Sequence, residues 1–177
     1  PVGYGVGDLK PHIIQGLEDG NYYLAELEAP AYYKAMEPVR IDYRSADAFH
    51  VIRGENKPIT GKLVIQKTDE DGKSLAGAVF ELSAYDQSGK EAEGFPITVS
   101  DTNGTVSVED LPVGKVKEDG SIGAYTYQLK EITPPDGFAA SSRVFTFSFD
   151  GDGGYREDPE AEYVLYETAV ENSPVRI

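Results

Sequence analysis

The sequence predicts an all-β protein. Helical periodicity is scarce along its 177 residues, whereas short β-rich runs bounded by Gly, Pro, Asp and Asn recur throughout. A hydrophobic content of 40% is sufficient for ordinary globular cores, and the length allows one large domain or two small ones. We therefore expect β-strands packed face to face rather than helical layers.

Composition excludes several classes of function. The formal net charge of -15 would repel a phosphate backbone, so we expect no nucleic-acid partner. The absence of cysteine excludes disulfides and Cys-based metal sites. The acidic turns DEDGKS and DGDGG lack the glutamate that completes an EF-hand loop, so we expect no metal or other cofactor. No signal peptide, long apolar span or lipidation motif is visible, and we expect an internal piece of a mature chain with no membrane contact.

The first 58 residues predict a short series of strands. HIIQGLEDG is expected to form a strand and a turn, and NYYLAELEAPAYY places Tyr22, Leu24 and Glu26 on one strand face before Pro30 ends it. PVRIDYR and AFHVIRGENKP are expected to be later strands. Residues 58–61 then read as a linker.

The stretch GKLVIQKTDEDGKSLAGAVFEL opens the rest of the chain. Its alternation places Leu63, Ile65 and Lys67 on one face, so Lys67 should point inward. The polar turn DEDGKS predicts that the two apolar runs on either side are neighbouring strands. An inward lysine is costly when charged and unpaired, and it therefore requires a partner.

Further strands are expected downstream. The run 95–100 and the run 105–108 are separated by DTNG, which is typical of a hairpin. Residues 111–124 are expected to form a long polar loop, and residues 149–162 a second one. AYTYQLKEITPPDGF places Tyr127, Leu129 and Glu131 on one face. VFTFSF and YVLYETAVENSP complete the series, and in the latter Val170 and Asn172 share a face.

An internal repeat divides the chain. GLEDGNYYLAELEAPAYY matches the run from Gly123 to Phe138, and ENKPITGKL after the first segment parallels ENSPVRI at the end. The first copy contains no match to KTDEDGKSLAGAVFEL. We therefore predict that residues 1–58 are the C-terminal half of a domain and that residues 59–177 are a complete copy.

Three polar residues of the complete copy share the inward parity: Lys67, Glu131 and Asn172. Each has an ordinary explanation as a snorkelling lysine, a strand-end glutamate or a turn asparagine. Together they suggest chemistry, because a neutral lysine amine in a dry core could attack the carboxamide and expel ammonia. A buried glutamate could hold the lysine, polarise the carbonyl and shuttle the proton.

These motifs resemble the Cna B-type domain, a prealbumin-like β-sandwich repeated in the stalks of Gram-positive surface adhesins and pilins. The resemblance is carried by KTDEDGKSLAGAVFEL, YTYQLKEITPPDGF and AVENSP and covers residues 61–177. It implies tandem immunoglobulin-like or prealbumin-like sandwiches, the first one incomplete. It also implies a spontaneous isopeptide bond between Lys67 and Asn172, with Glu131 as the catalytic residue.

The same resemblance assigns Glu26 and Asn56 of the first segment to the family's glutamate and cross-link acceptor. The lysine of that segment is absent, and Lys57 is a poor substitute because it directly follows Asn56. A cross-link in the first segment is therefore left open.

The implied function is structural: a stalk or pilin-shaft module, extracellular and anchored to the cell wall or in a pilus, rather than a turnover enzyme. Its expected partners are neighbouring modules of the same protein and a segment that completes the first domain. Two alternatives stay open. One is an adhesin module that binds a host matrix protein or glycan through loops 112–124 and 150–162. The other is an accessory domain of an extracellular carbohydrate-active enzyme.

Overall fold

The computed structural model describes residues 12–46, 51–101, 103–149, 155–157 and 163–175. Within these ranges every regular element is a β-strand, which confirms the all-β prediction. Contacts within the chain define two compact units, Pro1–Pro58 and Ile59–Ile177, and each is described by itself. No helix among the described residues is long and apolar enough to cross a membrane.

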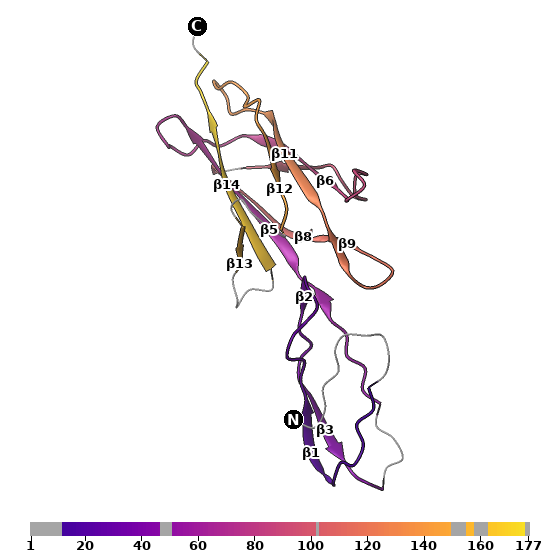
Figure 1. Cartoon of the computed structure of the whole chain (residues 1–177). Helices are drawn as coiled ribbons and strands as arrows, with labels where there is room; N and C mark the ends of the chain where they lie inside the picture. The colour runs from indigo at the N-terminus through magenta and orange to yellow at the C-terminus, as the bar shows by residue number, and fades with distance from the viewer. Residues whose placement is uncertain (1–11, 47–50, 102, 150–154, 158–162, 176–177) are drawn as a thin grey trace. The chain divides into compact units, whose positions relative to one another are not determined.

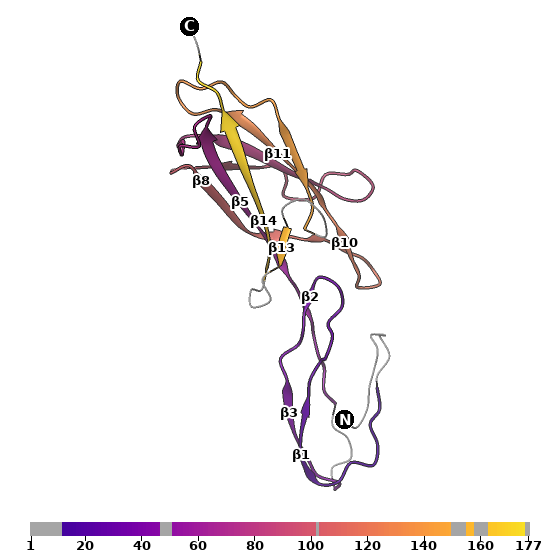
Figure 2. The same ribbon diagram turned by 60° about the vertical axis from the view of Figure 1, so that its left-hand side comes forward.

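The second unit consists of two four-stranded sheets and a small hairpin (Figures 1 and 2). The first sheet has the order β12 (Val144–Phe147), β11 (Thr126–Thr133), β6 (Val79–Tyr85), β7 (Ile97–Ser100). The second has the order β13 (Tyr155–Glu157), β14 (Tyr163–Asn172), β5 (Thr60–Asp69), β8 (Thr105–Pro112). The hairpin pairs β9 (Gly114–Val116) with β10 (Ile122–Ala124).

The core of this unit contains side chains from both sheets. Alternate residues of β5 and β11 are buried, as the period of two in the sequence predicts. Phe147 of the first sheet stacks on Tyr166 of the second, with ring centroids 4.0 Å apart. Tyr127 stacks on the other side of this group, 5.2 Å from Phe147. Aromatic packing of this kind adds to the burial of apolar area and fixes the two sheets face to face.

Strands β5 and β14 form the one parallel pair among the described strands, and they lie side by side in both ribbon views (Figures 1 and 2). They are the first and last strands of the second unit. Their register pairs Lys67 with Val170 and Asp69 with Asn172. Lys67 and Asn172 thus lie two residues apart along neighbouring strands.

Two predicted strand pairings are wrong. The strands on either side of DEDGKS, β5 and β6, lie in different sheets, as do β7 and β8 on either side of DTNG. The turn chemistry itself is present: Asp69 Oδ1 accepts hydrogen bonds from the backbone N–H groups of Asp71 and Lys73 at 3.0 and 2.8 Å. After the turn the chain crosses to the facing sheet. A polar turn therefore reverses the chain without fixing which sheet receives the next strand.

Two predicted loops contain strands. Residues 111–124 include the end of β8 and the β9–β10 hairpin, and residues 149–162 include β13, which pairs with β14. Backbone pairing forms these strands with few apolar side chains to mark them. Gly114 permits the hairpin, because a Cβ there would collide with the backbone of Gly123 and Ala124. Residues 150–154 and 158–162 of the second predicted loop lie outside the described residues.

The first unit has two short antiparallel pairs. Strand β1 (Gly20–Leu24) pairs with β3 (Val39–Tyr43), and β2 (Tyr33–Lys34) pairs with β4 (Lys57–Pro58). The predicted strand beginning at His12 is not formed, since residues 12–18 have no regular structure. The strand predicted at 48–58 is also wrong over residues 51–56. Its counterpart in the second unit, β14, pairs with β5, and no strand among the described residues of the first unit takes the place of β5.

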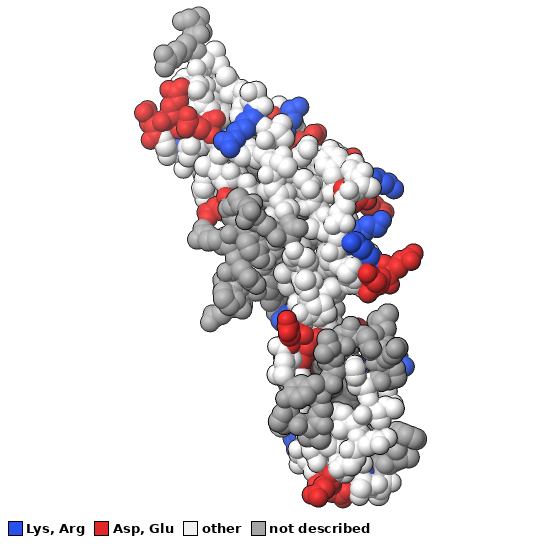
Figure 3. Space-filling model, in the orientation of Figure 1, with Lys and Arg blue, Asp and Glu red and all other residues white. Residues whose placement is uncertain are grey.

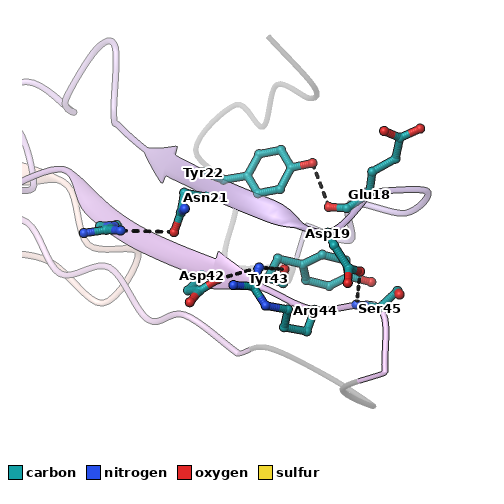
Figure 4. Close-up of polar contacts among 9 residues, drawn as sticks. Glu18, Asp19, Asn21, Tyr22, Asp42, Tyr43, Arg44 and Ser45 are labelled. Atoms are coloured by element: carbon teal, nitrogen blue, oxygen red, sulfur yellow. Dashed lines mark hydrogen bonds and ion pairs between the residues drawn. The ribbon is translucent and has the colours of Figure 1, made fainter.

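Polar contacts join the ends of the β1–β3 pair (Figure 4). The backbone N–H of Ser45 donates to Asp19 Oδ1 at 2.7 Å, and the Tyr22 hydroxyl donates to the carbonyl of Glu18 at 2.9 Å. The hydrogen bonds from Ser45 lower the pKa of the Asp19 carboxyl. These contacts fix the turn end of the pair where few apolar side chains are available.

Charged side chains are distributed over the surface. In the view of Figure 3, acidic and basic groups stand at several separate places with uncharged areas between them. Some are paired, as in the 2.8 Å contact between Lys62 Nζ and Glu109. The net negative charge is therefore not gathered into one continuous acidic face in this view.

Candidate functional site

Lys67 is fully buried in the core of the second unit, with 0% of the residue exposed. Its Nζ donates hydrogen bonds to the backbone carbonyls of Thr68 and Val170, both at 3.0 Å. Burial lowers the pKa of its amine, because a dry environment disfavours the charged form. Nearby carboxylates, with Glu131 the largest contributor, oppose this shift in part. The neutral amine, which is the nucleophilic form, is thus more accessible here than on an ordinary surface lysine.

Glu131 and Asn172 are also buried, with 4% and 2% of each residue exposed. The carboxamide nitrogen of Asn172 donates to both carboxylate oxygens of Glu131, at 3.1 Å to Oε1 and 2.9 Å to Oε2. The backbone N–H of Ser141 donates to Oε2 at 2.6 Å. The carboxamide oxygen Oδ1 of Asn172 is buried without a hydrogen-bond partner. The glutamate is therefore held on two sides, while the carbonyl of the asparagine keeps an unused acceptor.

Both sheets are needed to assemble these three residues. Lys67 and Asn172 come from the adjacent strands β5 and β14, and Glu131 comes from β11 in the facing sheet. Each occupies an inward position of its strand. The resulting cluster, Lys67, Glu131 and Asn172, is called the buried triad below. It combines an amine nucleophile, a carboxamide and a carboxyl group able to carry a proton, which are the groups that amide exchange requires.

The first unit contains a similar pair without a lysine. The carboxamide nitrogen of Asn56 donates to Glu26 Oε2 and, at 3.0 Å, to the carbonyl of Lys34. The backbone N–H of Met36 donates to the same carboxylate oxygen at 2.9 Å. Both side chains are half-buried rather than buried, and Lys57 beside them is exposed. The structure thus brings together Glu26 and Asn56 but supplies no buried amine from the residues that it describes.

The backbone groups at these sites were not identified from the sequence. Ser141 lies ten residues after Glu131, and Met36 lies ten residues after Glu26. Aligning the two copies of the repeat beyond the glutamate would have pointed to this position, although Ser and Met share no side-chain chemistry. The carbonyl of Val170, which holds the Lys67 amine, carries no signal in the sequence because every residue has such a group.

Other polar groups offer no cofactor site. Among the described residues, no group of three or more His, Asp or Glu side chains lies close enough to hold a metal ion. Asp101 is buried, but its Oδ1 accepts backbone N–H groups from Asn103 and Thr105 in the DTNG turn. That arrangement is turn chemistry of the Asx type.

Comparison with known families identifies the class of protein. Residues 61–159 match the family model of the SpaA prealbumin-like fold domain, which is more than half of the chain. The chain therefore belongs to this family. The prealbumin-like fold predicted from the Cna B-type motifs is confirmed.

Solved structures share the fold. The TIE protein of Bacillus anthracis has a TM-score of 0.56 at 23% identity, over 88% of this chain and 25% of that one. The major pilin SpaD of Corynebacterium diphtheriae has a TM-score of 0.48 at 25% identity, over 71% and 34%. The pilus 2b backbone protein of group B streptococcus has a TM-score of 0.47 at 19% identity, over 85% and 52%. The chain thus spans from about a quarter to about half of the length of these proteins. No curated protein matches it.

Proposed function

We propose that this chain is part of a structural stalk or pilin shaft on the surface of a Gram-positive bacterium, closed by an isopeptide bond between Lys67 and Asn172. The observation that carries the proposal is the burial of an amine, a carboxamide and a carboxyl group in one cluster. Leaving a lysine in a core is costly, and conversion of its amine into a neutral amide removes that cost.

The reaction requires only the residues of the buried triad. The neutral Nζ of Lys67 attacks Cγ of Asn172, and a new C–N bond forms while the bond from Cγ to Nδ2 breaks. Glu131 accepts a proton from the attacking amine and delivers it to the departing nitrogen, which leaves as ammonia. The hydrogen bonds from Asn172 Nδ2 to Glu131 place the leaving group against the carboxyl group that protonates it.

The reaction occurs once per molecule, and the product is the folded chain itself. The protein is accordingly a structural component and not a turnover enzyme. We place it outside the cell, in a pilus or a wall-anchored surface protein, with neighbouring modules of the same protein as its partners. A covalently closed β-sandwich without disulfides suits that setting, since it resists unfolding and proteolysis without depending on redox conditions.

Intact mass spectrometry tests the proposal. The chain is expected to be lighter than its sequence by one ammonia, and a protease digest is expected to yield a branched peptide that joins β5 to β14. A Lys67→Arg chain should have the full sequence mass. Lys62→Arg is the matched control, because Lys62 lies on the opposite face of the same strand and forms an ion pair with Glu109. A parent chain of full mass would exclude the cross-link.

A further inference from the structure

The two units share a local arrangement residue by residue. Tyr33 pairs with Pro58 in the first unit, and Phe138 pairs with Pro174 in the second; each proline follows its asparagine by two residues. The turn that precedes each aromatic residue closes in the same way, from Tyr33 N–H to Pro30 at 3.0 Å and from Phe138 N–H to Pro135 at 3.1 Å. The Glu26–Asn56 pair therefore occupies the place of Glu131 and Asn172, with the same polar geometry.

The sheets around this shared arrangement differ. In the second unit β11 lies between β12 and β6, whereas β1 of the first unit pairs with β3 alone among the described strands. Residues 51–56, which correspond to β14, have no strand beside them. The first unit thus presents two backbone edges where the second unit has β6 and β5.

The inner face of the β1–β3 pair is incompletely covered. Tyr22 and Leu24 are half-buried, while their counterparts Tyr127 and Leu129 have no exposed surface. Ile41, opposite Tyr22, is half-buried in the same way. An apolar sheet face of this kind is stabilised when a second sheet covers it.

Charge complementarity defines what fits there. In the second unit the amine of Lys67 lies in the field of Glu131. Glu26 holds a half-buried carboxylate with hydrogen bonds from Asn56 and Met36, and no cation accompanies it among the described residues. The occupant that satisfies the two edges, the apolar face and this carboxylate is a pair of strands with alternating apolar residues and one inward lysine.

We propose that the first unit is an acceptor for a polypeptide segment with the character of β5 to β8, and that Asn56 forms an isopeptide bond with the inward lysine of that segment. The donor amine attacks Cγ of Asn56, the Cγ–Nδ2 bond breaks, and Glu26 transfers a proton from the amine to the nitrogen that leaves as ammonia. The inference rests on the chemistry proposed for the buried triad. It adds a second reactive site, which takes its lysine from outside residues 12–58.

Lys57 and Lys34 do not fill this role within the unit. Lys57 directly follows Asn56 and is exposed in β4, so its side chain is directed away from the half-buried pair. Lys34 contributes its backbone carbonyl to Asn56. A donor strand is therefore needed to bring an amine to the inner side of Asn56.

The experiment mixes the full chain with a polypeptide of the sequence Ile59–Pro112, which carries the strands β5 to β8. The expected product is a covalent adduct whose mass is the sum of the two components less one ammonia, with the donor Lys67 joined to Asn56 in its digest. A donor with Lys67→Arg and an acceptor chain with Asn56→Ala or Glu26→Ala should each abolish the adduct.

Each alternative result would overturn the inference. Failure to form an adduct, even where the donor binds, would show that Asn56 is not a cross-link acceptor for such a strand. An adduct that persists with Asn56→Ala would place the reaction elsewhere. Loss of two ammonias by the chain alone, with Asn56 in a branched peptide, would show that the first unit supplies its own lysine. The mass of the chain alone reports the Lys67–Asn172 bond separately, so the two proposals can fail independently.

Discussion

Asn172 directs its carboxamide nitrogen at both carboxylate oxygens of Glu131, at 3.1 and 2.9 Å, across the interface between the two sheets of the second unit. The N–H of Ser141 holds the same carboxylate from the chain that follows β11, at 2.6 Å. Each partner is fixed by strand packing before any reaction. The leaving nitrogen and its proton donor are therefore positioned by the fold, which is the usual source of rate in a reaction between bound groups.

Replacement of Glu131 should prevent the cross-link while the sheets remain folded. In Glu131→Ala no carboxyl group can carry the proton from Lys67 to the leaving nitrogen, so the chain should keep its full sequence mass. Glu131→Gln should behave in the same way, because its amide retains hydrogen bonding but cannot accept the proton. Intact mass after prolonged incubation measures the outcome.

Glu93→Ala provides the matched control for these variants, since Glu93 is an exposed glutamate of the same unit. It should lose one ammonia as the parent does. A Glu131→Gln chain that reached the parent mass at the parent rate would remove Glu131 from the proposed mechanism.

The cross-link should contribute to the stability of the second unit. By analogy with a disulfide, closing a loop of about 100 residues stabilises the folded state by roughly 4 to 5 kcal/mol through the unfolded chain. Lys67→Met removes the bond but keeps an unbranched side chain in the core. Its unfolding in guanidinium chloride should therefore occur at a lower midpoint, with a free energy of unfolding reduced by about that amount.

Lys62→Met tests whether this loss belongs to the cross-link. The substitution removes an exposed charge on the other face of β5 and leaves the buried triad intact. Its midpoint should stay near that of the parent. Similar midpoints for Lys67→Met and the parent would mean that the bond is absent or does not stabilise the unit.

The buried amine should make stability depend on pH when no cross-link can form. In Asn172→Ala, Lys67 stays an amine with a pKa below the ordinary value of about 10.4. Between the folded pKa and the ordinary one, the unfolded chain binds more protons than the folded chain. The free energy of unfolding should therefore rise with pH across that window.

Urea denaturation at a series of alkaline pH values measures this slope. The control is the double variant Asn172→Ala with Lys67→Met, which lacks the titrating amine and should show a smaller rise. Equal slopes in the two chains would contradict a depressed lysine pKa.

Gly61 provides a test of the packing beside β5. A Cβ at this position would collide with the ring of Phe149, which is itself fully buried. Gly61→Ala should therefore lower the free energy of unfolding by about 1 to 3 kcal/mol, the usual range for overpacking a core. Gly123→Ala is the control, because its Cβ would meet the flexible ends of Lys117 and Gln87. A thermal denaturation midpoint for Gly61→Ala equal to that of the control would refute the close packing.

Alternation in the sequence predicts which side chains face inward. It correctly places Leu63, Ile65 and Lys67 on one buried face of β5, and Tyr127, Leu129 and Glu131 on one buried face of β11. A period of two reports the face of a strand and says nothing about its neighbours. The sequence could therefore indicate three inward polar residues, while their meeting from two sheets depends on pairings between distant strands.

The wrong predictions have the same physical origin. Residues 51–56 have the sequence of a strand but lack a partner like β5, so the preference of the residues alone does not form one. The short strand β9 forms where the sequence indicates a loop, because β10 supplies its hydrogen bonds. In each case the decision is made by a neighbour that the local sequence does not contain.

The parallel pairing of β5 with β14 determines how the second unit responds to a pulling force. Tension applied before the start of β5 and after the end of β14 draws the two strands past each other along their ten-residue length. The evenly spaced hydrogen bonds between parallel strands are then loaded together in shear. Two strands of a hairpin pulled from their open end would instead separate one bond at a time. The order in which this chain pairs its first and last strands thus gives the module its greatest resistance along its own axis of loading.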